Sequence, residues 1–254
     1  MSDHLSAQRL LWMLRTDVLR NHRAWLVASG TAALVALLVS VLGAMDRNVG
    51  AGVEFYRAFF IAALFASGTL ATSQAFVDLH GRTTNTAFLM LPASALEKTL
   101  ARLLLTTAGL FVYLLLLTMV LSWVLEGVNT ATFGVQRELF VPFDRTAWSM
   151  LPHYLAVQSL FFLGAAWFRK LHYIKTVGAA LLIVIGLSTV GVLILRLFGG
   201  ATTLGGGFGM GDGLGNPIQL VIDVAPIAYY FVLPVFCWFV AWLRVTEAQV
   251  SHGI

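Results

Sequence analysis

The chain carries little charge for its length. Asp, Glu, Lys and Arg make up 11% of its 254 residues, whereas a water-soluble domain contains about 25%. Hydrophobic residues make up 59%, and the mean hydropathy is +0.84. This composition excludes an ordinary soluble domain and indicates a protein whose surface is largely apolar.

Several residue patterns of enzymes and metalloproteins are missing. Cys237 is the one cysteine, so no intrachain disulfide can form. None of the three lysines follows a glycine, which excludes the Gly-Lys-Ser/Thr ending of a Walker nucleotide-binding loop. No HExxH zinc motif occurs, and the six histidines are scattered singly. The sequence therefore predicts no catalytic residues, no metal site and no cofactor bound directly, and we expect the chain not to be an enzyme.

Six long apolar runs dominate the rest of the chain. Each is about long enough to cross ~30 Å of hydrocarbon. Runs such as "LFVYLLLLTMVL" are continuously apolar, unlike the alternating strands of a membrane β-barrel. The sequence thus predicts an all-α polytopic membrane protein with about six transmembrane helices. The predicted spans are residues 24–44, 58–77, 103–125, 148–168, 177–198 and 224–243.

The basic residues are distributed unevenly between the two sides of this topology. With the N-terminus inside, eleven of the sixteen Lys and Arg residues lie on the inner side. The positive-inside rule favours that orientation, so both termini are predicted to be cytoplasmic. Basic residues beside a membrane also account for the net charge of +4, and no nucleic-acid partner is predicted.

The segment before the first run has the pattern of an amphipathic helix. On a helix, Leu10, Leu14 and Val18 share one stripe, and the arginines at 9, 20 and 23 lie largely elsewhere. Such a helix lies in the membrane interface with its basic side chains at anionic lipid head groups. We therefore predict an interfacial elbow helix at 1–23, a transmembrane domain at 24–244 and a cytoplasmic tail at 245–254. An ordinary positively charged anchor is the alternative. The elbow residues are Arg9, Leu10, Leu14, Arg15, Arg20 and Arg23.

The stretch "MLPASALEK", residues 90–98, has the pattern of a helix start. Pro92 ends what precedes it, because the residue before a proline avoids helical angles. Ser94 and Glu97 fit a capping box, in which each side chain binds the other residue's backbone N–H. The helix would continue to Leu125 and be about 46 Å long. Because this exceeds the hydrocarbon thickness, its first turns must protrude, tilt or bend.

The second run contains a stripe of small residues at four-residue spacing. Small residues in this arrangement let two membrane helices approach closely. Packing within the chain is one interpretation, and a subunit interface or a cargo path is the other. The stripe consists of Ala63, Ser67, Ala71 and Ala75.

Residues 209–212 read GMGD, which matches the GxGD motif of intramembrane aspartyl proteases. That chemistry needs two carboxyl groups that share a proton, and Asp223 is the obvious partner of Asp212. Both are predicted to lie in a glycine-rich outer loop. The protease stays an alternative to the function that follows. No carboxylate falls at the centre of a predicted span, which argues against a proton-driven transporter.

The six spans, the amphipathic leading segment and the stretch "LMLPASALEKTLARLL" together resemble an ABC-2 type permease, the membrane subunit of type V-like bacterial ABC exporters. The resemblance implies a multi-pass protein of the bacterial cytoplasmic (inner) membrane. It implies two associated permease subunits, identical or different, each contacting a cytoplasmic ABC ATPase. ATP and Mg²⁺ would bind to that partner subunit.

By this resemblance, the loop before the third span and the start of that span form the segment that couples the permease to the ATPase. We expect this coupling segment at 79–102. The scarcity of buried charge points to export of an apolar or amphipathic cargo. A non-transporting membrane scaffold is the alternative from another class. The candidate coupling residues are Arg82, Pro92, Ser94, Glu97, Lys98 and Arg102.

Overall fold

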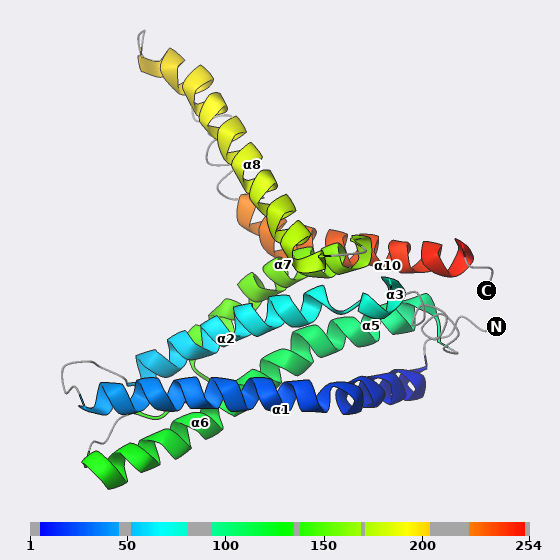
Figure 1. The fold of residues 1–254 in the computed structure, drawn as a ribbon. Helices are drawn as coiled ribbons and strands as arrows, with labels where there is room; N and C mark the ends of the chain where they lie inside the picture. Colours follow the sequence, from blue (N-terminus) through cyan, green and yellow to red (C-terminus); the bar gives the residue numbers. More distant parts are fainter. Residues whose placement is uncertain are drawn as a thin grey trace.

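The computed structural model describes six stretches of the chain, and all the regular structure within them is helical (Figure 1). Five helices of this described part are long and apolar enough to cross a membrane. The predicted class, an all-α multi-pass membrane protein, is thereby confirmed. The described residues are 6–45, 52–80, 93–134, 138–168, 171–203 and 224–251.

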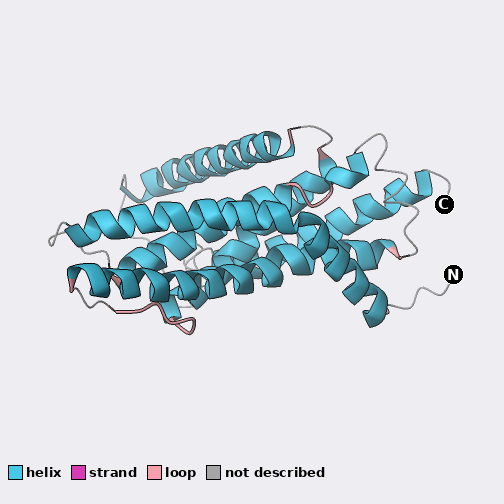
Figure 2. Ribbon diagram, turned by 60° about the horizontal axis from the view of Figure 1, so that its bottom comes forward, coloured by secondary structure: helices cyan, strands magenta, loops and turns pink. Residues whose placement is uncertain are grey.

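Helix α1 runs from Ala7 to Met45 without interruption. At 1.5 Å per residue its 39 residues extend over about 58 Å. The predicted boundary between an elbow helix at 1–23 and a span at 24–44 is therefore not a helix boundary. Figure 2 shows instead that the helix bends, with the turns nearest the N-terminus inclined to the rest.

Helix α2, Val53–Ser73, is followed by a turn at residues 74–76 and by the short α3, Val77–His80. The second span thus begins before residue 58, where it was predicted, and its helix ends before residue 77. Ala75 lies in the turn, so the stripe of small residues does not continue along one helix.

The third span is built from three joined segments that form one helix of 39 residues. They are α5, Ala95–Leu104, the π-helical η1, Leu105–Gly109, and α6, Leu110–Phe133. Gly134 ends the helix with a φ of 66°, the left-handed conformation in which glycine is preferred. The helix ends eight residues beyond residue 125, where its end was predicted. The π-helical η1 was not predicted.

Helix α7, Arg145–Trp167, is the most enclosed helix of the described part and packs against α2, α8 and α10. It is the one predicted span that is not among the five described helices that are long and apolar enough to cross a membrane. Its buried face includes the polar side chains of Gln158 and Ser159. Because neighbouring helices cover this face, α7 needs less apolar surface than a helix that faces lipid.

Helix α8, His172–Thr203, packs on α7 only near its start and then leaves the bundle (Figure 1). Its large apolar side chains from Leu181 to Leu193 are exposed. The last span starts with a helical turn at 224–227 and continues through the π-helical η2, Ala228–Val232, into α10, Leu233–Ser251. The predicted tail at 245–254 therefore begins inside α10, where Val245 is fully buried.

The start of α1, the start of α5 and the end of α10 lie at one end of the bundle, together with α3 (Figure 1). We call this the α5 end, and the opposite end, where α6 terminates and α2 begins, the α6 end. An even number of crossings brings both ends of a chain to one side. That this side is cytoplasmic stays a prediction.

Candidate functional site

The predicted capping box is present at the start of α5. The backbone N–H of Glu97 donates to Ser94 Oγ at 3.2 Å, and the N–H of Ser94 donates to Glu97 Oε2 at 2.9 Å. Two N–H groups that a helix start leaves without partners are satisfied in this way. This part of the sequence interpretation is confirmed.

Glu97 also binds the start of α1, which the sequence pattern did not indicate. The backbone N–H of Ser6 donates to Glu97 Oε1 at 2.8 Å, and Arg9 Nε lies 3.6 Å from the same oxygen. The Glu97 side chain is fully buried. The Glu97 carboxylate therefore links the first turn of α5 to the first turn of α1. The predicted elbow and coupling segments are in contact there.

A second group of charges joins the same elements one turn further into the bundle. Arg102 of α5 lies 3.2 Å from Asp17 of α1 and 3.1 Å from Asp78 of α3. Arg20 of α1 binds Asp78 through both terminal nitrogens, at 3.1 and 3.2 Å. We call these residues, with Arg9 and Glu97, the α5-end charge network. Sequence reasoning missed its two aspartates because nothing local marks Asp17 or Asp78 as a partner of Arg102.

The other predicted residues of this end have varied surroundings. Lys98 is fully buried, and the Arg15 guanidinium lies 5.7 Å from the centre of the Trp12 ring. Leu10 and Leu14 are half-buried, whereas Arg23 is exposed. The exposed apolar residues of this part of α1 are Leu11, Trp12, Val18 and Leu19. Outside the described residues lie Arg82, Pro92, the GMGD motif at 209–212 and Asp223.

The stripe of small residues lies beside the point where α2 and α7 approach each other. Its members are half-buried or buried, and the Ser67 hydroxyl donates to the carbonyl of Ala63. The closest approach is at the neighbouring Gly68. A Cβ there would lie 2.8 Å from the Tyr154 hydroxyl oxygen and closer still to the ring. The pattern thus identified the helix, and the structure assigns the contact to Gly68.

A buried polar cluster connects the third span, α7 and the last span. The Tyr154 hydroxyl donates to the Thr106 carbonyl, and Gln158 Nε2 donates to Thr106 Oγ1 at 3.1 Å. Trp238 Nε1 of α10 lies 3.4 Å from Gln158 Oε1. Thr106 belongs to η1, and π-helical turns inside longer helices are frequent at functional sites. No sequence pattern marks these four residues.

The other π-helical turn, η2, contacts the same stretch of α7. The Tyr230 hydroxyl lies 3.0 Å from His153 Nε2, and the His153 ring meets the rings of Tyr229 and Tyr230 edge to face. Both irregular turns of the described bundle therefore bind α7 between residues 153 and 158. The arrangement makes α7 the shared partner of the third and last spans.

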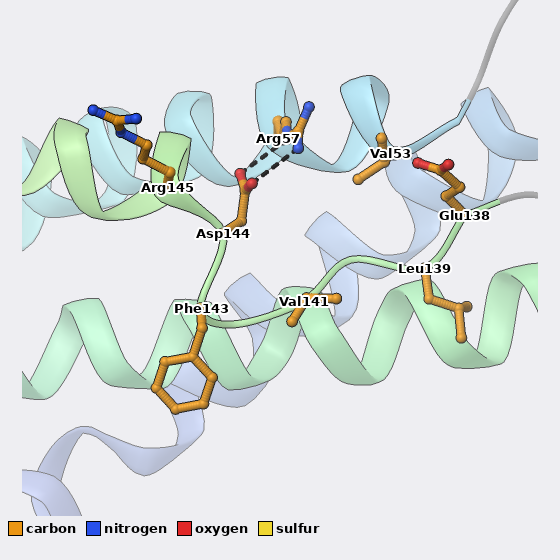
Figure 3. Close-up of a pocket in the computed structure, with 8 residues that line it drawn as sticks. All are labelled: Val53, Arg57, Glu138, Leu139, Val141, Phe143, Asp144 and Arg145. Carbon is orange, nitrogen blue, oxygen red and sulfur yellow. Dashed lines mark hydrogen bonds and ion pairs between the residues drawn. The ribbon is translucent and has the colours of Figure 1, made fainter.

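A pocket of about 280 Å³ opens at the α6 end between the start of α2 and the segment that precedes α7 (Figure 3). Arg57 Nε and Nη2 each donate to the Asp144 carboxylate at 2.9 Å. Burial raises the pKa of Asp144, but the hydrogen bonds and charge of Arg57 outweigh it and hold that pKa below its ordinary value. The lining residues are Val53, Arg57, Glu138, Leu139, Val141, Phe143, Asp144 and Arg145.

No protein-family model matches the chain, and no curated protein or solved structure shows significant similarity to it. Among the described residues, no three His, Cys, Asp or Glu side chains lie close enough to hold a metal ion. What the fold itself defines is a multi-pass helical membrane protein. Its described polar side chains join helices to one another at both ends and in the middle of the bundle.

Ser94→Ala is expected to lower the free energy of unfolding by about 1 kcal/mol, the usual cost of losing an N-cap side chain. The N–H of Glu97 would lose its acceptor. The Glu97 carboxylate would still accept from the backbone N–H groups of residue 94 and Ser6. Denaturant titration of the purified protein in mixed micelles measures the change. Ser149→Ala in the first turns of α7, where the hydroxyl only donates back to the Thr146 carbonyl, is the matched control and should be nearly neutral.

Proposed function

We propose that the chain is the membrane-spanning subunit of an ABC-2 type exporter in the bacterial cytoplasmic membrane. Energy would come from ATP, bound with Mg²⁺ and hydrolysed on a separate ABC ATPase subunit. One observation carries this proposal: the capped helix α5 is fastened to α1 at the α5 end and continues without a break into the third span. The resemblance in "LMLPASALEKTLARLL" adds to it.

The mechanism follows from how a helix transmits force. A continuous helix of 39 residues is stiff along its axis, so displacement of α5 moves α6 as well. Arg102 would carry the motion to α1 and α3 through Asp17 and Asp78. Thr106 would carry it to α7 through Tyr154. Closure of the ATPases at the α5 end could thus rearrange the spans around α7.

The burial of the charged residues defines their roles in this mechanism. Glu97 and Lys98 are fully buried, so they position α5 and do not contact a partner directly. Leu96, in the same turn, is 39% exposed and offers an apolar contact for an ATPase surface. Sequence reasoning did not single out Leu96, because an apolar residue at the start of a membrane helix is unremarkable.

The exposed apolar faces of α8 and α10 support the remaining parts of the proposal. Both helices present large apolar side chains over much of their length. Such surfaces fit contact with lipid, with a second permease subunit, and with an apolar or amphipathic cargo that moves along them. Residues 181–193 of α8 and 224–243 of the last span include no charged side chain, which argues against a path for a small ion along them.

The decisive experiment is purification of the chain from its native membranes to find whether a Walker-type ATPase co-purifies, followed by ATP hydrolysis by the complex in liposomes. We expect a stable complex in which hydrolysis depends on this subunit. Transport by the chain in liposomes without any companion protein would contradict the proposal. A complex that hydrolyses ATP at the same rate with and without this subunit would instead favour the membrane scaffold.

Glu97→Lys is expected to lower permease-dependent ATP hydrolysis by about fivefold or more, the lower end of typical coupling free energies. The change places a cation beside Arg9 and removes the acceptor of Ser6 and Ser94. Glu247→Lys, near the end of α10 and 65% exposed, is the matched charge reversal and should leave the hydrolysis rate unchanged. Equal rates for the two variants would show that the α1–α5 contact plays no part in coupling.

A further inference from the structure

The pocket at the α6 end carries two charges beyond its internal ion pair. Arg57 pairs with Asp144 inside the pocket and with the exposed Glu54 outside its lining, so its guanidinium is fully engaged. Glu138 and Arg145 are exposed, and neither forms an ion pair with another residue in the described part of the chain. Figure 3 places these two side chains on opposite sides of the pocket. The pocket is therefore neutral overall, with an available anion at one side and an available cation at the other.

An apolar strip borders the same pocket. Leu139, Val141 and Phe143 are 44%, 55% and 82% exposed, whereas Phe140 between them is 1% exposed. Residues 139–141 alternate as an extended segment does, with one buried and one open face, and Phe143 is exposed in the turn at 142–143, which Asp144 N closes on the carbonyl of Val141 at 3.0 Å. Phe140 anchors the buried face, with its ring centre 5.9 Å from that of Phe60. The open face thus presents three apolar side chains beside the charges.

Trp148 holds the strip in place from the other side. Its Nε1 donates to the carbonyl of Pro142 at 3.0 Å, and its ring meets that of Phe111 of α6. The segment from Glu138 to Asp144 is therefore fixed to α2, α6 and α7. The charges and the apolar strip belong to a surface with a defined shape.

We propose that this pocket binds the head group of a zwitterionic phospholipid from the surrounding bilayer. The ammonium group would lie at Glu138, the phosphate at Arg145, and the acyl chains along Leu139, Val141 and Phe143. A charge-assisted hydrogen bond at each side orients the head group. A volume of about 280 Å³ lies at the small end of ligand pockets and suits a head group with its chains outside.

Charge complementarity favours a zwitterion over a simple anion or cation. An anionic head group would meet Arg145 but also the carboxylate of Glu138. A cationic ligand would meet Glu138 but also the guanidinium of Arg145. Only a ligand that carries both charges satisfies both sides of the pocket. This lipid site does not depend on the proposed exporter function, because it needs neither an ATPase nor a cargo.

The test is native mass spectrometry of the full chain in detergent, titrated separately with dioleoyl phosphatidylethanolamine and dioleoyl phosphatidylglycerol. The two lipids share acyl chains and phosphate and differ in the ammonium group. We expect the wild type to prefer phosphatidylethanolamine. Glu138→Gln should weaken phosphatidylethanolamine binding by about fivefold, as for an exposed ion pair, and spare phosphatidylglycerol. Arg145→Gln should weaken the binding of both lipids.

Arg244→Gln and Glu247→Gln are the matched controls, because they carry the same exchanges on exposed residues of α10 that pair with each other at 2.8 Å. Neither should change the preference between the two lipids. Phe143→Ser, on the most exposed residue of the strip, should weaken both lipids and gives a second readout. If Glu138→Gln keeps the wild-type preference, or the controls lose it equally, the site is refuted. Either result leaves the exporter proposal untouched, since no ATPase is present.

Discussion

Arg102→Leu is expected to lower the free energy of unfolding by about 3–5 kcal/mol, the cost of breaking a buried ion pair from one side. Arg102 is the common partner of Asp17 and Asp78, and all three side chains are at most 17% exposed. Without the guanidinium, two carboxylates would stay close together in a largely dry environment. Arg20 forms an ion pair with Asp78 and acts on Asp17 through a weaker electrostatic attraction, so it offsets the two carboxylates only in part.

The measurement is denaturant titration in mixed micelles, with Arg15→Leu as the control. Arg15 lies on the same part of α1 but contacts only the face of an exposed tryptophan ring, so its loss should cost little. The triple variant Asp17→Asn, Asp78→Asn and Arg102→Leu should recover much of the stability, because no buried charge is left unpaired and Arg20, whose side chain is 59% exposed, is solvated. A single Arg102→Leu variant as stable as Arg15→Leu would contradict the network.

Gly68→Ala is expected to destabilise the protein by about 1–3 kcal/mol through overpacking. The added methyl group would overlap the ring of Tyr154. That ring is fully buried, touches Phe65 edge to face and is held by the hydrogen bond from its hydroxyl to Thr106. It cannot move aside without breaking the polar cluster that joins η1 to α7.

Gly127→Ala in α6 is expected to stabilise the protein. A Cβ at Gly127 meets no atom within 4 Å, and alanine in a helix interior is more stable than glycine by roughly 0.5–1 kcal/mol. The two glycine variants should therefore change the midpoint of unfolding in opposite directions. The same sign for both would show that α2 and α7 do not approach closely at Gly68.

Arg102→Leu and Gly68→Ala test two separate attachments of the third span. Arg102 attaches it to α1 and α3, and Thr106 attaches it to α7 one turn later. The π-helical η1 begins between them, at Leu105. If α5 moves during a functional cycle, this turn is where its motion passes into α7, through the hydrogen bond from Tyr154 to Thr106.

The local features of the chain could be predicted from its sequence because they depend on neighbouring residues. The length and composition of an apolar run decide whether it can span a membrane. In the described part of the chain, a long helix lies at each of the six expected runs. The capping box depends on Ser94 and Glu97, three residues apart. Helix ends were less accurate, as in α1 and α10, because amphipathic ends continue a helix without the apolar signal that marks a span.

Contacts between distant residues could not be predicted in this way. Glu97 meets Ser6 across 91 positions, and Arg20 meets Asp78 across 58. Gly68 was overlooked beside a more conspicuous stripe, and Tyr154, its partner, carries no pattern of its own. The pocket at the α6 end likewise brings Arg57 together with residues some eighty positions later in the chain.

By itself the sequence determined that this protein crosses a membrane several times and where α5 begins, because apolar run length and helix capping act within a few residues. Only the tertiary structure decided that α1, α3 and α5 share one charge network and that α7 is the partner of both π-helical turns. These pairings arise when the helices pack, because a charge that becomes buried is destabilising unless a partner, here from another part of the chain, lies beside it.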